Sequence, residues 1–147
     1  MNAYEELLVL LAKNNIRYII VGGLACALNG YVRPTIDVDI LIEYTSENIN
    51  NLLKTLTDYK NGYAKELKVE DFTDEEGAIR IIEDFPIDIF VKISGYYYKD
   101  ILEYIRYKNI ENYNIPYLDK KMLIILKNDS LREIDKIDVI NLKELPD

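Results

Sequence analysis

The chain contains no histidine and a single cysteine, Cys26, among its 147 residues. Without histidine, neither a Ser-His nor a Cys-His catalytic pair can form, and zinc cannot be held by imidazole ligands. One cysteine cannot form a disulfide within the chain, which agrees with a reducing compartment. The apolar runs are much shorter than the roughly 20 residues of a membrane-spanning helix. The segment 1–15 carries acidic residues where a signal peptide would be basic. We therefore expect a cytoplasmic protein without membrane contact.

The chain has fewer basic than acidic residues: 18 Lys and Arg and 26 Asp and Glu, which gives a net charge of −8. Proteins that bind extended DNA or RNA need a basic surface that neutralises phosphates. The charge balance therefore argues against a long nucleic-acid groove, although a small basic pocket is compatible with it. At 49% hydrophobic and 30% charged residues, the composition is that of a globular protein. The length predicts one domain, 1–147.

Hydrophobic periodicity predicts alternating helices and strands. The expected strands are 17–21, 37–43, 78–82 and 87–93, with a short extended piece at 115–118. The expected helices are 3–14, 24–29, one capped by Ser46, 98–108, one capped by Asp119, and 131–144. This order indicates an α/β (α+β) domain with a mixed sheet, flanking helices and a helical C-terminal part.

Two aspartates interrupt an apolar strand in the segment TIDVDILIE. The two-residue period of a strand puts Asp37 and Asp39 on one face, opposite the apolar side chains that would enter the core. Two carboxylates 4 Å apart at an effective dielectric near 20 repel by roughly 4 kcal/mol. That is a large part of a domain's net stability of about 5–15 kcal/mol. A proton, a basic side chain or a divalent cation must offset this repulsion.

A third acid, Asp88, lies inside the apolar strand IDIF. If that strand lies beside the Asp37/Asp39 strand, three carboxylates gather, and such oxygen ligands suit Mg²⁺ or Mn²⁺. Two such ions can hold the attacking and leaving oxygens of a phosphoryl displacement. The pair Gly22-Gly23, between a strand and a helix, offers backbone N–H groups to a phosphate. These features indicate nucleotide chemistry.

The combined pattern resembles the minimal nucleotidyltransferases of the polymerase β superfamily. It consists of Gly22-Gly23, then R-x-T-x-D-x-D from Arg33 to Asp39, then Asp88 on a later strand. The closest resemblance is to the group that includes AbiEii-like toxins and lincosamide nucleotidyltransferases. The C-terminal part is similar to that group as well, through the set Lys127, Arg132, Asp135 and Asp138. It departs from the group at Ile134, where a lysine is common.

The resemblance implies a catalytic core at about 16–95, a helical part at about 98–145, and a role for each matching residue. Asp37 and Asp39 would bind two Mg²⁺ or Mn²⁺ ions, and Asp88 would bind the catalytic ion and help to activate the acceptor. The nucleoside triphosphate would be held by a second group of residues: the Gly22 and Gly23 backbone, Arg33, Thr35 and Lys127. Simpler interpretations stay open, because Arg33 could merely neutralise an acid, and the C-terminal charges could form a salt-bridged helix face.

The implied activity is transfer of a nucleoside monophosphate from an NTP to a hydroxyl, with release of pyrophosphate. The acceptor could be a protein, a small molecule or a tRNA end, and the acidic composition argues against tRNA. A toxin–antitoxin protein partner or a homodimer would also fit this group. The alternative is a non-catalytic nucleotidyltransferase-fold protein that acts as a binding partner. The three intact acids argue against that alternative.

Overall fold

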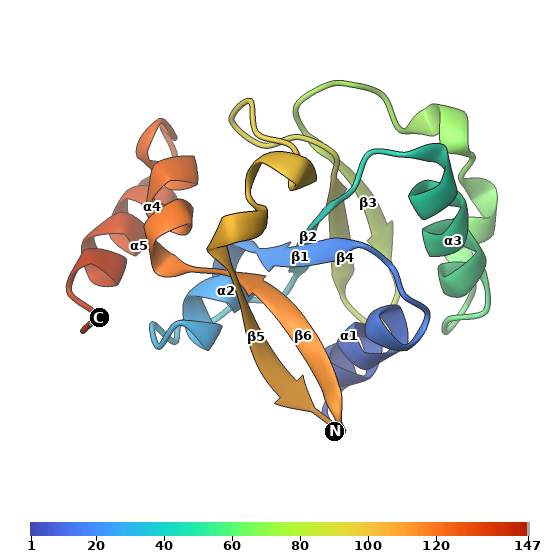
Figure 1. Cartoon of the computed structure of the whole chain (residues 1–147), viewed down its shortest axis with the longest axis horizontal. Coiled ribbons are helices and arrows are strands. Elements are labelled where there is room, and N and C mark those ends of the chain that lie inside the picture. The colour runs from blue at the N-terminus through green and yellow to red at the C-terminus, as the bar shows by residue number, and fades with distance from the viewer. Residues whose placement is uncertain (147) are drawn as a thin grey trace.

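A mixed sheet organises residues 1–146, the part of the chain that this computed structural model describes (Figure 1). Its six strands lie in the order β3-β4-β2-β1-β6-β5. Their bounds are β1 Tyr18–Val21, β2 Val38–Ile42, β3 Ala78–Ile82, β4 Pro86–Phe90, β5 Ile105–Ile110 and β6 Tyr113–Leu118. The helices are α1 Ala3–Lys13, α2 Gly22–Leu28, α3 Ser46–Thr57, α4 Lys120–Asn128 and α5 Glu133–Lys143. The expected α/β fold with a mixed sheet and a helical C-terminal part is confirmed.

The central strands are buried because they pair on both sides. Strand β1 is antiparallel to β2 and parallel to β6, and β2 is parallel to β4. All four residues of β1 are buried, and Ile19, Ile20, Ile40 and Leu41 have no solvent exposure. Continuous apolar runs of this kind are typical of central strands that are covered on both faces. These paired inner strands set the register of the polar side chains that they carry.

Side-chain caps begin three of the helices. Asn2 and Glu5 form a capping box at α1, and Asp119 accepts a hydrogen bond from the Met122 amide, as expected for α4. At α3 the cap is Thr45 rather than the predicted Ser46, because the Thr45 hydroxyl accepts from the Asn48 amide. The difference of one residue changes neither the helix nor its buried stripe.

The predicted helix at 98–108 is wrong. Two short 3₁₀ turns, Tyr98–Asp100 and Leu102–Tyr104, lead instead into β5, which pairs with β6 along its whole length. Glu111 and Asn112 both have positive φ, 50° and 68°, as a two-residue hairpin turn of the primed type requires. The apolar residues have a helical spacing, but the hydrogen bonds to β6 that form in the folded protein favour a strand.

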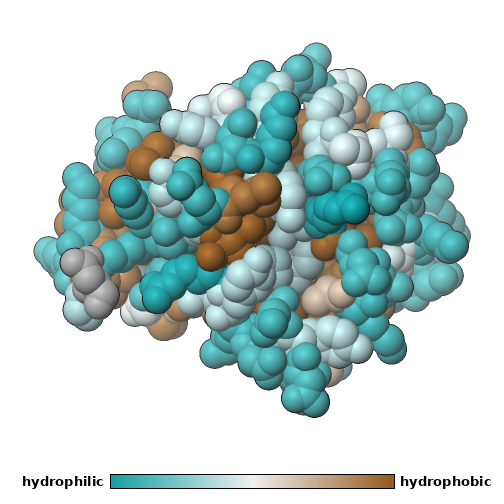
Figure 2. All heavy atoms as spheres, in the orientation of Figure 1, coloured by the Kyte–Doolittle hydropathy of each residue, from teal (hydrophilic) through white to brown (hydrophobic). Residues whose placement is uncertain are grey.

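The remaining differences are at element ends. Strand β4 ends at Phe90 instead of continuing to residue 93, and β2 begins one residue after Asp37. The helices α4 and α5 pack together at one side of the molecule, far from α3 (Figure 1). The face shown in Figure 2 is mainly hydrophilic, with apolar residues gathered near its centre. None of the helices in residues 1–146 is long and apolar enough to cross a membrane.

Candidate active site

One row of residues crosses four neighbouring strands and carries the acids. Val21 on β1 stands opposite Asp39 on β2, Asp39 is paired with Asp88 on β4, and Asp88 is paired with Arg80 on β3. Side chains in register on adjacent strands point to the same face of a sheet and lie about 5 Å apart. The register therefore places the two carboxylates side by side, as the sequence predicted.

Asp37, just before β2, completes the cluster. One carboxylate oxygen from each of Asp37, Asp39 and Asp88 lies within 4.8 Å of the others. Burial, together with the charges of Asp37 and Asp88, raises the pKa of the Asp39 carboxyl to about 7. Near neutral pH, without metal, a proton on Asp39 therefore relieves part of the repulsion among the three acids.

Arg80 neutralises the other side of the cluster, and the sequence interpretation missed it. Its Nε and Nη2 donate to the two oxygens of Asp88 at 2.7 and 2.9 Å, and its Nη2 lies 3.6 Å from Asp37. The hydrogen bonds from Arg80 hold the pKa of Asp88 below its usual value. The sequence could have indicated this pair, because β3 and β4 form a short local hairpin. Ile82 pairs with Pro86, and two residues further from the turn Arg80 pairs with Asp88.

The glycine pair lies directly against the acids. Gly22 has φ +68°, and a Cβ built on it would lie 2.1 Å from Oδ2 of Asp39. A Cβ on Gly23 would lie 2.9 Å from the Thr35 hydroxyl and 3.1 Å from the Arg33 guanidinium. Gly22 therefore requires glycine, because of its positive φ and its close approach to Asp39. At Gly23 a side chain would displace the ends of the Thr35 and Arg33 side chains.

Gly22→Ala is expected to lower the free energy of unfolding by about 2 kcal/mol or more and to abolish Mn²⁺ binding. The left-handed backbone alone costs a non-glycine residue roughly 1–2 kcal/mol, and the methyl group would also displace Asp39. Gly95→Ala is the matched control, since Gly95 has φ +82° with nothing within 4 Å of its Cβ position. Urea unfolding and Mn²⁺ titration of both variants compare the two effects. Equal destabilisation with Mn²⁺ binding retained in Gly22→Ala would contradict the close approach to Asp39.

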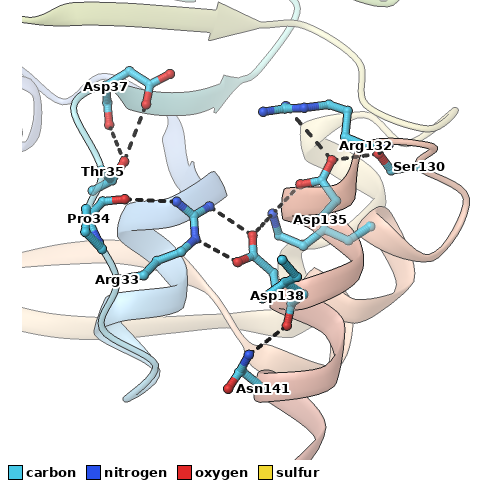
Figure 3. Close-up of polar contacts among 11 residues, drawn as sticks. Arg33, Pro34, Thr35, Asp37, Ser130, Arg132, Asp135, Asp138 and Asn141 are labelled. Carbon is cyan, nitrogen blue, oxygen red and sulfur yellow. Dashed lines mark hydrogen bonds and ion pairs between the residues drawn. The ribbon is translucent and has the colours of Figure 1, made fainter.

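A second charged cluster fastens the C-terminal helices to this site (Figure 3). Asp138, which is fully buried, accepts two hydrogen bonds from Arg33, at 2.7 and 2.9 Å, and one from Lys127 at 3.0 Å. Lys127 also donates to Asp135 at 3.0 Å, and Asp135 accepts from the Ser130 hydroxyl at 2.7 Å. Arg33 therefore neutralises Asp138 on α5 rather than Asp37 or Asp39. Lys127 bridges α4 and α5.

A cavity of about 200 Å³ joins the two clusters. Its lining includes Arg80, Arg132 and all eight residues to which the resemblance assigns a metal-binding or triphosphate-binding role: Gly22, Gly23, Arg33, Thr35, Asp37, Asp39, Asp88 and Lys127. A neighbouring hollow of about 240 Å³ shares Gly22, Asp39 and Lys127 with it and has apolar walls that include Phe90 and Leu126. The fold thus collects residues from the N-terminal, central and C-terminal parts of the chain around one opening. The phosphate contacts expected of Arg33, Thr35 and Lys127 stay predictions.

The acid cluster suits a hard divalent cation. Its donors are carboxylate oxygens alone, the ligand type that Mg²⁺ and Mn²⁺ prefer. Oδ1 of Asp39 is buried and has no hydrogen-bond partner within residues 1–146. A buried polar atom without a partner is rare and costly, and a metal ion would satisfy it.

Solved structures place this chain in the nucleotidyltransferase fold. The lincosamide antibiotic adenylyltransferase LnuA, solved with lincomycin bound, superposes with a TM-score of 0.65 at 16% identity over 99% of both chains. A proposed nucleotidyltransferase from Thermotoga maritima gives 0.58 at 18% identity over 96% of this chain and 93% of its own. An antigenic nucleotidyltransferase-like protein from Paracoccidioides brasiliensis gives 0.55 at 19% identity over 94% and 72%. No protein-family profile and no curated sequence matches the chain.

Proposed function

We propose that this protein is a metal-dependent nucleotidyltransferase, which moves a nucleoside monophosphate from an NTP to a hydroxyl and releases pyrophosphate. The observation that carries the proposal is the set of three carboxylates within 4.8 Å of one another, one of them with a buried unpartnered oxygen, beside the glycine pair. The nucleotidyltransferase fold of the chain supports it.

Each acid has a distinct task in this proposal. Asp37 and Asp39 would hold two Mg²⁺ or Mn²⁺ ions, and Asp88, which lies on a different strand, would hold one of them on the acceptor side. Such ions neutralise the charge that develops on the transferring phosphoryl group. Asp88 also orients the acceptor hydroxyl and favours loss of its proton. Because the chain contains no histidine, this task falls to a carboxylate.

The triphosphate is positioned by backbone and side-chain donors around the same cavity. Gly22 and Gly23 present backbone N–H groups with no side chain in the way. Thr35 lies beside them, with its hydroxyl 3.4 Å from the Asp37 carboxylate. Arg33 and Lys127 line the cavity at the side of α5, where they are paired with Asp138 and Asp135. These groups hold the phosphates in line with the acceptor, which is the main task in phosphoryl transfer.

The acceptor we favour is a small molecule or a protein. The net charge of −8 opposes a long RNA track. The similarity to LnuA, whose structure contains the antibiotic lincomycin, extends over nearly the full length of both chains and supports a small-molecule acceptor. A protein acceptor, such as the partner of a toxin–antitoxin pair, and a homodimer that closes the cleft are further arrangements that this fold allows.

The test is to incubate the protein with each α-labelled NTP and Mg²⁺ in a lysate of the source cell, with Asp88→Asn as the inactive control. We expect label to appear in one acceptor class with the wild type and to be absent with the variant. Pyrophosphate release with any acceptor supports the reaction. Label that appears equally with wild type and variant would contradict a role for this site.

Nucleotide with metal should also stabilise the fold. A ligand at about 100 times its dissociation constant adds roughly 2.7 kcal/mol. In a domain of this size that raises the melting temperature by about 5–10 °C. The measurement is a melting scan with Mg²⁺ and a non-hydrolysable NTP, with Mg²⁺ alone as the control. An unchanged melting temperature at millimolar nucleotide would argue against nucleotide binding.

A further inference from the structure

Asp88, the proposed metal ligand on the acceptor side, is already paired with the guanidinium of Arg80. Arg80 donates to both of its oxygens in a two-point ion pair, and it also lies 3.6 Å from Oδ2 of Asp37. Two-point pairs of this geometry are among the strongest hydrogen-bonded contacts in proteins. The guanidinium therefore occupies the side of the cluster where Asp37 and Asp88 face one another.

A metal ion on the same oxygens would meet a positive charge a few ångströms away. Like charges at that separation repel one another even where one of them is exposed to water. The ion and the guanidinium thus compete for Asp88, and binding of one weakens binding of the other. Asp39, by contrast, has an oxygen that accepts no hydrogen bond from Arg80 or from any other donor within residues 1–146.

Arg80 can leave Asp88 without disturbing the fold. Its side chain is 52% exposed, and β3 is an edge strand with several exposed residues. Water can therefore solvate the released guanidinium. Arg33 provides the contrast: its side chain is only 17% exposed and is paired with fully buried Asp138.

We propose that Arg80 is a displaceable counter-ion, which neutralises Asp88 and Asp37 between turnovers and is expelled when the acceptor-side ion binds. Arg80 thereby sets the metal concentration that the site needs. It also keeps three clustered acids compatible with a folded metal-free protein. The inference rests on the proposed function, because it assumes that the acid cluster binds a metal ion.

Titration with Mn²⁺ alone, followed by the paramagnetic resonance signal of the free ion, tests this competition. Arg80→Gln removes the charge and is expected to tighten binding of the weaker Mn²⁺ ion by about tenfold. Arg80→Lys keeps a charge but loses the two-point geometry, so it should fall between Arg80→Gln and the wild type. Arg106→Gln, on the exposed edge strand β5, makes the same change in net charge away from the site and should leave the affinity within about twofold of wild type.

Thermal unfolding provides a second readout that a merely structural arginine would not reproduce. In EDTA, Arg80→Gln should melt below the wild type, because Asp88 and Asp37 lose their counter-charge. In saturating Mn²⁺ the difference should close or reverse. A difference of the same size in both buffers would mean that Arg80 supports the fold in every state, and would overturn the proposal.

The titration tests the counter-ion role of Arg80 separately from metal binding by the acid cluster. If the wild type binds Mn²⁺ and Arg80→Gln binds it equally or more weakly, the counter-ion role is wrong and the metal site stands. If neither protein binds Mn²⁺, the metal-dependent function and the counter-ion role fall together.

Discussion

Asp39→Asn is expected to reduce nucleotidyl transfer by roughly three orders of magnitude and, at the same time, to stabilise the metal-free protein. The loss of activity follows from the proposed position of Asp39 between both ions. The gain in stability follows from its surroundings, since a buried carboxylate beside two other acids is costly to ionise. Asparagine keeps the shape of the side chain and removes the charge.

The raised pKa of Asp39 determines how the stability of the metal-free protein depends on pH. Because the pKa of Asp39 is raised to about 7 in the folded protein, the folded state holds a proton that the unfolded state has released. Titration of Asp39 should therefore lower the stability of the metal-free wild type as the pH rises from about 4 to about 7. Above that range its contribution should change little. At pH 8 the variant should be more stable by roughly 2–4 kcal/mol, and at pH 4 the two should be equal.

Urea unfolding in EDTA from pH 4 to pH 8 measures this, and Asp88→Asn is the matched comparison. Asp88 is stabilised by Arg80, so its neutralisation should reduce turnover comparably while lowering stability in the absence of metal. The two isosteric variants thus share one effect on catalysis and have opposite effects on folding. A metal-free Asp39→Asn protein that is less stable than wild type at pH 8 would show that the Asp39 charge is not strained.

The largest loss of stability is expected from Asp138→Ala. Asp138 is fully buried between Arg33 and Lys127, so its removal leaves two shielded cations without their shared partner. Breaking a buried ion pair on one side typically costs 3–5 kcal/mol. Since Asp138 connects α5 to the loop that carries Arg33 and to α4, the variant should also lose nucleotide binding.

Denaturant unfolding compares the free energy of unfolding of Asp138→Ala with that of Glu133→Ala. Glu133 lies on the same helix in an exposed pair with Lys136, with nitrogen and oxygen 3.5 Å apart, and such pairs contribute at most about 1 kcal/mol. We expect the first variant to be far less stable and the second to be nearly unchanged. Similar small losses in both would mean that water or local rearrangement replaces the buried pairs.

The repulsion among Asp37, Asp39 and Asp88 is offset in two ways in the metal-free protein. A proton is favoured on Asp39 near neutral pH, and Arg80 is paired with Asp88 and close to Asp37. Both are reversible, which suits the ion binding that we propose for this site.

The sequence by itself indicated the central strands, most helices and eight of the residues that line the cavity. Short apolar runs broken by Gly22-Gly23 or by a capping residue such as Asp119 identify elements locally, because backbone geometry and side-chain caps act over a few residues. Acids inside such runs mark a site, because nothing structural favours a charge there.

Only the tertiary structure decided which of these residues meet. The parallel pairing of β2 with β4, which sets Asp39 beside Asp88, joins strands about fifty residues apart, and no local pattern encodes that register. The same holds for Arg33 and Asp138, 105 positions apart. Tyr98, Ile101, Leu102 and Ile105 have a helical spacing, which predicts a helix over 98–108. Residues 105–110 form a strand instead, because hydrogen bonding to β6 outweighs a weak local preference.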